Sequence, residues 1–212
     1  MGFDGIYPYI ADICDEAKSK KISENIRCGL MTKYGVSVVD TRAPYYSHKG
    51  YWNGSVWMPH QWVLWIASLD KGDGELGKKI AFTALDLWKN EVELTYNCYE
   101  HFMISNGRGA GFHQFSGLST PVLMWYRAYF SPGTVSSGFM TFINNLKWNE
   151  DYSSFSCDIT STTKNSQILV CLSEKFEYEF FVSGKKVPFE KITKGAYLIK
   201  ADCGQIKAVK KQ

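Results

Sequence analysis

The spacing of apolar residues changes once along this chain, at Ser131-Pro132-Gly133. Before this point apolar side chains recur every three or four positions, which is typical of helices that bury one face. After it, short segments rich in Val, Ile, Phe, Tyr and Thr alternate with turn residues, which is typical of antiparallel strands. The pattern therefore predicts an α+β chain, with a helical domain at residues 1–131 and a β-domain at residues 132–212.

The first of these domains is predicted to be mostly helical. Helices are expected at residues 7–20, 22–30, 59–70, 74–93 and 120–130. Pro59 and Pro121 stand in the first turn of their helices, where proline is favoured. The segment 59–70 is apolar nearly all round, so we expect it to be buried on several sides. No strand is expected before residue 130.

Two long segments between these helices, residues 32–57 and 96–117, are predicted to be loops. Unstructured loops of this length are uncommon in compact domains unless they have a function. The second loop places Glu100 among aromatic residues and then continues through Gly107, Gly109 and Gly111. Because glycine has no side chain, we expect this run to let the backbone approach a ligand closely.

The second domain is predicted to consist of antiparallel strands. They are expected at residues 138–146, 154–160, 167–172, 176–182, 187–192 and 196–201. Apolar and polar residues alternate in FEYEFFV, as in a strand with one buried face. Ser183-Gly184 follows it and predicts a tight hairpin turn.

Composition excludes several classes of partner. The net charge is +3 and the basic residues are scattered, so we expect no nucleic-acid binding. No run of eighteen apolar residues occurs, so we expect no membrane-spanning segment. The six cysteines show neither CxxC spacing nor zinc-ligand spacing with histidine, which predicts free thiols, no metal and no cofactor.

The first residues, MGFDGIYPYIADI, lack the basic and apolar regions of a signal peptide and enter a helix at once. We therefore expect the chain to be part of a longer protein, which leaves a cytoplasmic or a periplasmic location open. Aromatic residues make up 16% of the chain. Many can be core residues, but where Trp and Tyr cluster with polar residues in predicted loops they suit stacking on sugar rings.

Two such clusters resemble motifs of one enzyme group. The stretch "KYGVSVVDTRAPYY" followed by "YWNGSVW" resembles the loop and Tyr-Trp-x-Gly-x-Val-Trp motif of (α/α)6-barrel glycoside hydrolases. About forty residues later, "YEHFMISNGRGAGFHQFSG" is similar to their Tyr-Glu-x-Tyr-x-x-x-x-Gly-x-Gly run. The nearest group contains glycoside hydrolase family 63, the trehalases and the glycogen-debranching glucosidases. Asn53 and Ser55 stand where that motif often has Arg and Pro.

The resemblance covers about residues 1–130 and implies a fold. That fold is the C-terminal part of an (α/α)6 toroid, followed by a small antiparallel β-sandwich-like domain. It also implies an inverting glycoside hydrolase for glucosidic or mannosidic linkages, with Glu100 as the general base. Inverting hydrolysis needs a second carboxyl group about 6.5–9.5 Å away as the general acid. In these enzymes the acid lies upstream, and neither Asp40 nor Asp70 matches it, so we expect it to be missing from this chain.

The resemblance also implies residues that contact an oligo- or polysaccharide. They are Tyr51, Trp52, Asn53, Trp57, His60, Tyr99, Gly109 and His113. We expect Tyr51, Trp52, Trp57 and His113 to form one cleft with Glu100. A partial toroid leaves apolar helix faces uncovered, so the missing N-terminal half of the barrel or a second copy of the chain is expected as a partner. The chain alone is expected to be inactive.

Two other function classes stay open. The chain could be a non-catalytic carbohydrate-binding or structural fragment, which the missing acid favours and the retained Glu100 disfavours. It could also belong to another α/α-toroid enzyme, an epimerase or a lyase. An epimerase would use histidines and a lyase a Tyr/His or Arg set, so the presence of only four histidines argues against both.

Overall fold

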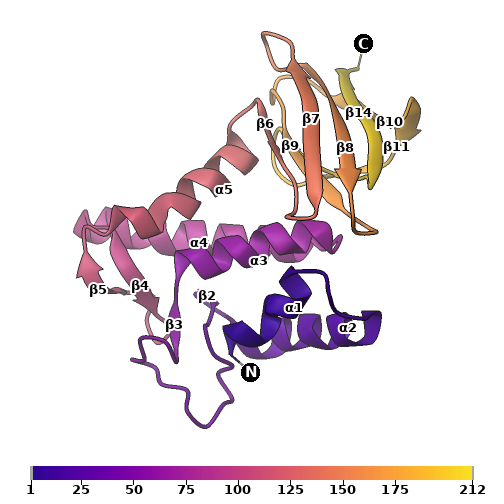
Figure 1. Ribbon diagram of the computed structural model, residues 1–212. Coiled ribbons are helices and arrows are strands. Elements are labelled where there is room, and N and C mark those ends of the chain that lie inside the picture. Colours follow the sequence, from indigo (N-terminus) through magenta and orange to yellow (C-terminus); the bar gives the residue numbers. More distant parts are fainter. Residues whose placement is uncertain (1, 212) are drawn as a thin grey trace. The chain divides into compact units, whose positions relative to one another are not determined.

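The structure is a computed structural model that describes residues 2–211 (Figure 1). It contains helices and antiparallel sheets, so the predicted α+β content is confirmed. Its contacts divide the chain into two compact units. Unit 1 is Met1–Trp65 with Lys79–Leu123, and unit 2 is Ile66–Lys78 with Met124–Gln212. The predicted domain boundary between residues 131 and 132 stays a prediction.

The start of unit 1 differs from the two predicted helices. The chain forms η1 (Phe3–Ile6), α1 (Tyr7–Ile10), α2 (Glu16–Asn25) and a π-helix, η2 (Ile26–Leu30). The predictions of one helix over residues 7–20 and of a new helix beginning at residue 22 were therefore wrong. The chain reverses at Asp12, where φ is 55°, and the Asp15 carboxylate caps α2 by accepting from the Lys18 N–H at 2.8 Å. Ile13 is exposed.

The three later helices confirm the predictions to within about two residues. They are α3 (Met58–Asp70), α4 (Gly74–Thr95) and α5 (Thr120–Phe130), which follows η3 (Ser116–Ser119). Each of α3, α4 and α5 contributes residues to both units. The helix α3 is buried on several sides, as its apolar sequence predicts, and even Gln61 is fully buried.

Unit 1 also contains strands, which the sequence did not predict. Its strands are β1 (Met31–Thr32), β2 (Gly35–Val36), β3 (Ser55–Val56), β4 (Tyr99–Met103) and β5 (Gly109–His113). β1 pairs with β2, and a second antiparallel sheet has the order β3–β4–β5. The predictions of no strand before residue 130 and of a loop over residues 96–117 were therefore wrong. β4 pairs with β3, far upstream, and short-range sequence patterns do not report such a non-local pairing.

Unit 2 is built mainly from antiparallel strands. They are β6 (Thr134–Ser136), β7 (Thr141–Trp148), β8 (Ser154–Ser161), β9 (Gln167–Cys171), β10 (Tyr178–Val182), β11 (Lys185–Val187), β12 (Phe189–Lys191), β13 (Ala196–Lys200) and β14 (Cys203–Lys210). One sheet has the order β11–β10–β14–β8–β7 and the other β12–β13–β9–β6. The predicted strands all have counterparts, but β6 and β14 were missed, and the segment 187–192 is divided between β11 and β12.

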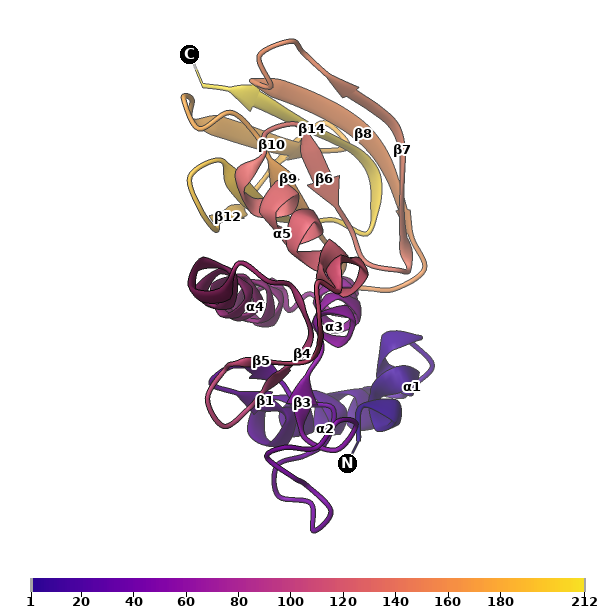
Figure 2. The same ribbon diagram turned by 90° about the vertical axis from the view of Figure 1, so that its left-hand side faces the viewer.

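The two sheets of unit 2 lie face to face (Figures 1 and 2). Their side chains share one core. β8 and β14 contribute Phe155 and Ile206 from the first sheet, and β9 and β13 contribute Val170 and Tyr197 from the second. The predicted turn at Ser183-Gly184 is confirmed. Both residues have positive φ, 49° and 79°, and Val182 pairs with Lys185 across them, as in the tight turns that suit antiparallel hairpins.

Candidate functional site

Glu100 lies on β4 of unit 1 and is held from two sides. The Tyr51 hydroxyl donates a hydrogen bond to Oε1, and the backbone N–H of Phe112 donates to Oε2 at 3.3 Å. The pKa of the Tyr51 phenol is raised, mainly by this hydrogen bond to Glu100 and secondly by burial. The loop before β3 and the strand β5 therefore both orient the Glu100 carboxylate.

A bulge in β5 makes this arrangement possible. Tyr99 pairs with His113 and His101 with Ala110, so β5 contains one residue more than β4 over this stretch. Gly111 lies in the bulge with φ of 74°, a conformation that glycine adopts without strain. A Cβ atom there would lie closer than 3.0 Å to Glu100 Oε2 and to the His101 ring. Gly111 therefore makes room for both side chains.

The neighbouring glycines have a similar role. A Cβ atom on Gly107 would collide with the Tyr34 ring, and one on Gly109 with the Tyr99 ring. The sequence suggested that this run lets the backbone approach a ligand. In the structure, the backbone at these glycines approaches side chains of the protein itself.

An aromatic stack lies next to Glu100. Trp52 stacks on Trp57 with ring centroids 4.2 Å apart and an interplanar angle of 5°, and Trp57 stacks on His101 at 5.1 Å and 19°. The Tyr51 ring meets all three rings edge-on, with centroids 4.9–5.3 Å away. Trp57 Nε1 donates to the Tyr51 carbonyl at 3.1 Å, which ties the loop to the stack. Trp52 is 57% exposed, so one end of the stack faces solvent.

His101 is the site residue that the sequence reasoning missed. It is only 6% exposed, and Nδ1 has no hydrogen-bond partner among the described residues. Burial lowers the pKa of its imidazole, and the negative charge of Glu100 opposes that shift. His101 follows Glu100 directly in the sequence, but a residue in a predicted loop has no defined orientation, so this position gave no prediction. The orientation of the His101 side chain is defined only once β4 is recognised as a strand.

Two other predicted residues lie at a pocket near the exposed end of the stack. Asn53 Nδ2 donates to the Tyr45 carbonyl at 2.8 Å, and the His60 ring meets Phe3 and Trp52 edge-on at 4.4 and 5.9 Å. Burial lowers the pKa of His60. The pocket has a volume of about 650 Å³ and is lined by Gly2, Phe3, Asp4, Gly5, Tyr7, Val38, Val39, Tyr45, Trp52, Asn53 and His60.

The remaining predicted residues lie along the hairpin. Tyr99 on β4 is in register with His113 on β5, and the Tyr99 ring packs on Gly109. His113, expected in a loop, is in a strand and exposed. The structure thus brings Tyr51, Trp52, Trp57 and Glu100 into one connected cluster. It places Tyr99, Gly109 and His113 on the hairpin beside that cluster.

Two polar contacts fix the elements that carry this cluster. Arg108, before β5, donates from Nε to the Glu91 carboxylate of α4 at 2.8 Å, and a second Arg108 nitrogen reaches the other oxygen at 3.3 Å. Gln61 of α3 accepts from the Val36 N–H at 2.7 Å and donates to the Val36 carbonyl at 2.8 Å. Both contacts are of the kind that buried polar groups require. They anchor the hairpin and β2 to helices.

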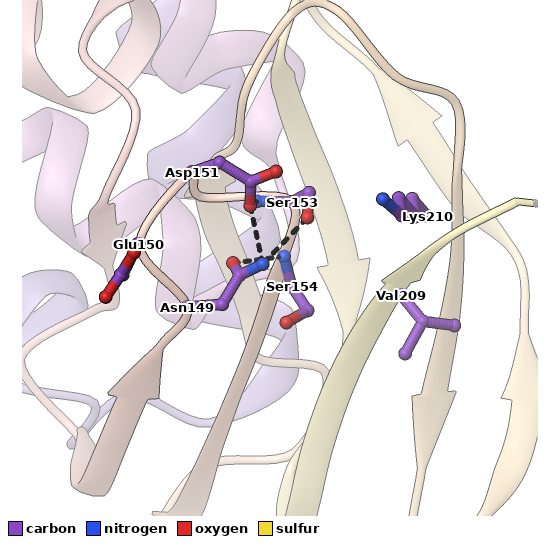
Figure 3. Close-up of a pocket in the computed structure, with 7 residues that line it drawn as sticks. All are labelled: Asn149, Glu150, Asp151, Ser153, Ser154, Val209 and Lys210. Atoms are coloured by element: carbon purple, nitrogen blue, oxygen red, sulfur yellow. Dashed lines mark hydrogen bonds between the residues drawn. The ribbon is translucent and has the colours of Figure 1, made fainter.

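Unit 2 has a pocket of its own. It has a volume of about 590 Å³ and is lined by Asn149, Glu150, Asp151, Ser153, Ser154, Val209 and Lys210 (Figure 3). Its polar groups mostly bond to one another: Asn149 Nδ2 donates to Asp151 and Ser153, and Asn149 Oδ1 accepts from the Ser154 N–H at 2.8 Å. These bonds close the turn between β7 and β8, so we interpret the pocket as turn structure.

The described residues hold no cluster of three or more His, Cys, Asp or Glu side chains that could bind a metal ion. Cys14, Cys28, Cys98, Cys157, Cys171 and Cys203 are all free thiols. Within residues 2–211, every helix is too short or too polar to cross a lipid bilayer.

A carboxylate beside a Trp and Tyr cluster, on a hairpin packed against helices, is the kind of site that carbohydrate-active enzymes use. The model of the mannosylglycerate hydrolase MGH1-like glycoside hydrolase domain matches residues 1–116. Because that match covers more than half of the chain, the protein belongs to this family of glycoside hydrolases.

Relatives of known activity agree with this assignment. The mannosylglycerate hydrolase MGH2 of Selaginella moellendorffii is 26% identical over 122 residues, which are 57% of this chain and 24% of the relative. The mannosylglycerate hydrolase of Thermus thermophilus is 25% identical over 124 residues, 58% of this chain and 29% of the relative. The chain therefore spans only about a quarter of the length of the curated relatives that it matches.

Solved structures show the same fold over somewhat more than half of the chain. The family 63 mannosylglycerate hydrolase from Thermus thermophilus, in complex with Tris and D-glycerate, gives a TM-score of 0.54 at 23% identity. The match covers 60% of this chain and 30% of that one. The same enzyme in complex with glucose gives a TM-score of 0.52, also at 23% identity, and covers 59% and 31% of the two chains. The resemblance to family 63 inferred from the two motifs is thereby confirmed.

Proposed function

We propose that this chain is the C-terminal part of an inverting glycoside hydrolase and that Glu100 is its general base. In this proposal the helices belong to an (α/α)6 toroid, and the strands after residue 131 form a β-sandwich-like domain, with the domain boundary between residues 131 and 132. The observation that carries the proposal is the carboxylate of Glu100, held by Tyr51 and Phe112 at the edge of the aromatic cluster. The fixed geometry suits a base that must remove a proton from one water molecule.

The substrate in this proposal is a small mannoside or glucoside, and mannosylglycerate is the first compound to test. Family membership and the names of the relatives support this choice. The sugar ring would contact Tyr51, Trp52 and Trp57 of the stack, with Asn53, His60, Tyr99, Gly109 and His113 as further contacts. Aromatic rings suit the apolar faces of a pyranose, and polar neighbours suit its hydroxyls.

The general acid lies outside this chain in our proposal. Asp40, one of the acids considered from the sequence, is tied to the Arg42 guanidinium by two hydrogen bonds at 2.6 and 2.8 Å. That pairing lowers the pKa of Asp40 to about 2, which is opposite to what a general acid needs at neutral pH. The acid would therefore come from residues upstream of Met1 in a longer protein, and the chain by itself would hydrolyse no glycoside.

The test compares the 212-residue chain with a version that carries upstream residues of its gene. We expect the longer version to release mannose and glycerate from mannosylglycerate and the shorter one to release none. In the longer version, Glu100→Gln should lower kcat by at least about 10²-fold and leave sugar binding nearly intact, because the amide keeps the shape but accepts no proton. Glu93→Gln, on the exposed face of α4, is the matched control and should change nothing.

Three results would contradict this proposal. Robust hydrolysis by the short chain would place the general acid within it. Full activity of the Glu100→Gln variant would remove Glu100 from the mechanism. Release of the sugar with retained anomeric configuration, followed by NMR, would exclude the inverting mechanism. A fourth result, sugar binding without any turnover in the longer version, would favour the alternative of a non-catalytic carbohydrate-binding protein.

A further inference from the structure

His101 is buried in the site with a polar atom that lacks a partner. The ring lies under Trp57, at 5.1 Å, and meets Tyr51 edge-on at 5.0 Å. Only 6% of the residue is exposed, and Nδ1 has no hydrogen-bond partner among the described residues. Leaving a buried polar atom without a partner destabilises a folded protein, so its presence beside the candidate base calls for a reason.

The unpartnered nitrogen and the carboxylate of Glu100 both lie next to Gly111. A Cβ atom on Gly111 would lie 2.9 Å from His101 Nδ1 and closer still to Glu100 Oε2. The two polar atoms therefore border the same small space, which any residue other than glycine would fill. Among the described residues, the titratable groups found to act on or contact the imidazole are Glu100, through its negative charge, and Tyr51, through an edge-on ring contact.

We propose that His101 is a positioning residue for Glu100. While the imidazole is neutral, the Glu100 carboxylate stays available to water. When the imidazole is protonated, it draws the carboxylate into an ion pair. This inference rests on the proposed role of Glu100 as a base. The neutral ring, with its proton on Nε2 and none on Nδ1, donates nothing to Oε2 and leaves a lone pair of that oxygen free for the attacking water. The protonated ring places a positive charge next to Oε2, and a carboxylate paired with a cation is a weaker base.

Burial favours the neutral form, because it lowers the pKa of the imidazole below its ordinary value of 6.5. His101 is therefore neutral at pH 7, and the site loses its base in acid as His101 gains a proton. A role in packing alone makes a different prediction. A ring that only fills space beneath Trp57 would not respond to the charge of Glu100.

The experiment follows the ionisation of the four histidines of the 212-residue chain by NMR, using the imidazole ¹H–¹³C signals. Each signal is assigned with a His→Gln variant. We expect His101 to titrate below 6.5, and we expect Glu100→Gln to lower its pKa further, because the substitution removes the negative charge that favours the imidazolium. His48, which is exposed and whose Nδ1 lies 3.2 Å from the Tyr46 hydroxyl, is the control, and Glu100→Gln should leave its signal unaffected.

A second measurement uses the longer, active version of the protein. On the acid side of its pH profile, log(kcat/KM) should fall more steeply with decreasing pH than in His101→Gln, because protonation of His101 adds to the loss of the base. His48→Gln should leave the profile unchanged. The proposal is overturned if Glu100→Gln leaves the His101 titration where it was, or if the acid side of the profile stays as steep in His101→Gln.

The two proposals fail in different ways. If Glu100 is not the base, Glu100→Gln stays active in the longer protein, whatever the histidine titration shows. If only the inference about His101 is wrong, Glu100→Gln is inactive but the His101 signal does not respond to it.

Discussion

Gly111→Ala is the sharpest test of how the candidate site is built. Gly111 has φ of 74°, and the left-handed conformation costs a residue with a Cβ roughly 1–2 kcal/mol. The new methyl group would also lie closer than 3.0 Å to the flexible end of Glu100, which can move aside, and to the ring of His101, which is buried and must shift. Overpacking against such a buried ring typically costs about 1–3 kcal/mol. The free energy of unfolding should therefore fall by about 2–5 kcal/mol in all.

Two other glycines separate these contributions. Gly184 has φ of 79°, but no atom lies within 4 Å of the position that an alanine methyl group would take, so Gly184→Ala should cost only the backbone part, roughly 1–2 kcal/mol. Gly117 has no positive φ and nothing within 4 Å, so Gly117→Ala should be neutral or stabilise the protein by up to about 1 kcal/mol.

The assay is urea unfolding followed by tryptophan fluorescence and by far-UV circular dichroism. Two signals are needed because the chain has two compact units, which can unfold separately. The packing of Glu100 and His101 against Gly111 would be refuted if Gly111→Ala cost no more than Gly184→Ala.

Two further predictions concern the ion pairs of unit 1. Arg108→Gln removes the partner of the buried Glu91 carboxylate, so the backbone amides of the β4–β5 hairpin should exchange with deuterium faster. Lys89→Gln, which breaks an exposed ion pair, is the control and should leave their exchange rates unchanged. Arg42 lowers the pKa of Asp40 from 3.8 to about 2, so this pair stabilises the protein above about pH 4 and less and less as the pH falls towards 2. Arg42→Gln should therefore flatten the dependence of unfolding free energy on pH in that window, and an unaltered acid profile would contradict the pairing.

The sequence by itself determined the elements that depend on local pattern. The helices α3 and α4 follow from apolar spacing, and α5 from Thr120-Pro121 at its start. The turn at Ser183-Gly184 follows from residues that tolerate positive φ. The two motifs around Tyr51 and Glu100 were enough to indicate the glycoside hydrolase family, because their residue types and their order can be recognised in one sequence.

Only the tertiary structure decided how the site is assembled. Glu100 was taken for a loop residue because glycines follow it, and the strand exists because β4 finds β3 far upstream in the chain. The stack of Trp52, Trp57 and His101 likewise joins side chains from separate segments. Local pattern cannot encode which distant backbone a strand will pair with, nor which glycine leaves room for a carboxylate. Packing between segments that are distant in the sequence sets those features. His101 was therefore identified as a site residue only from the folded structure.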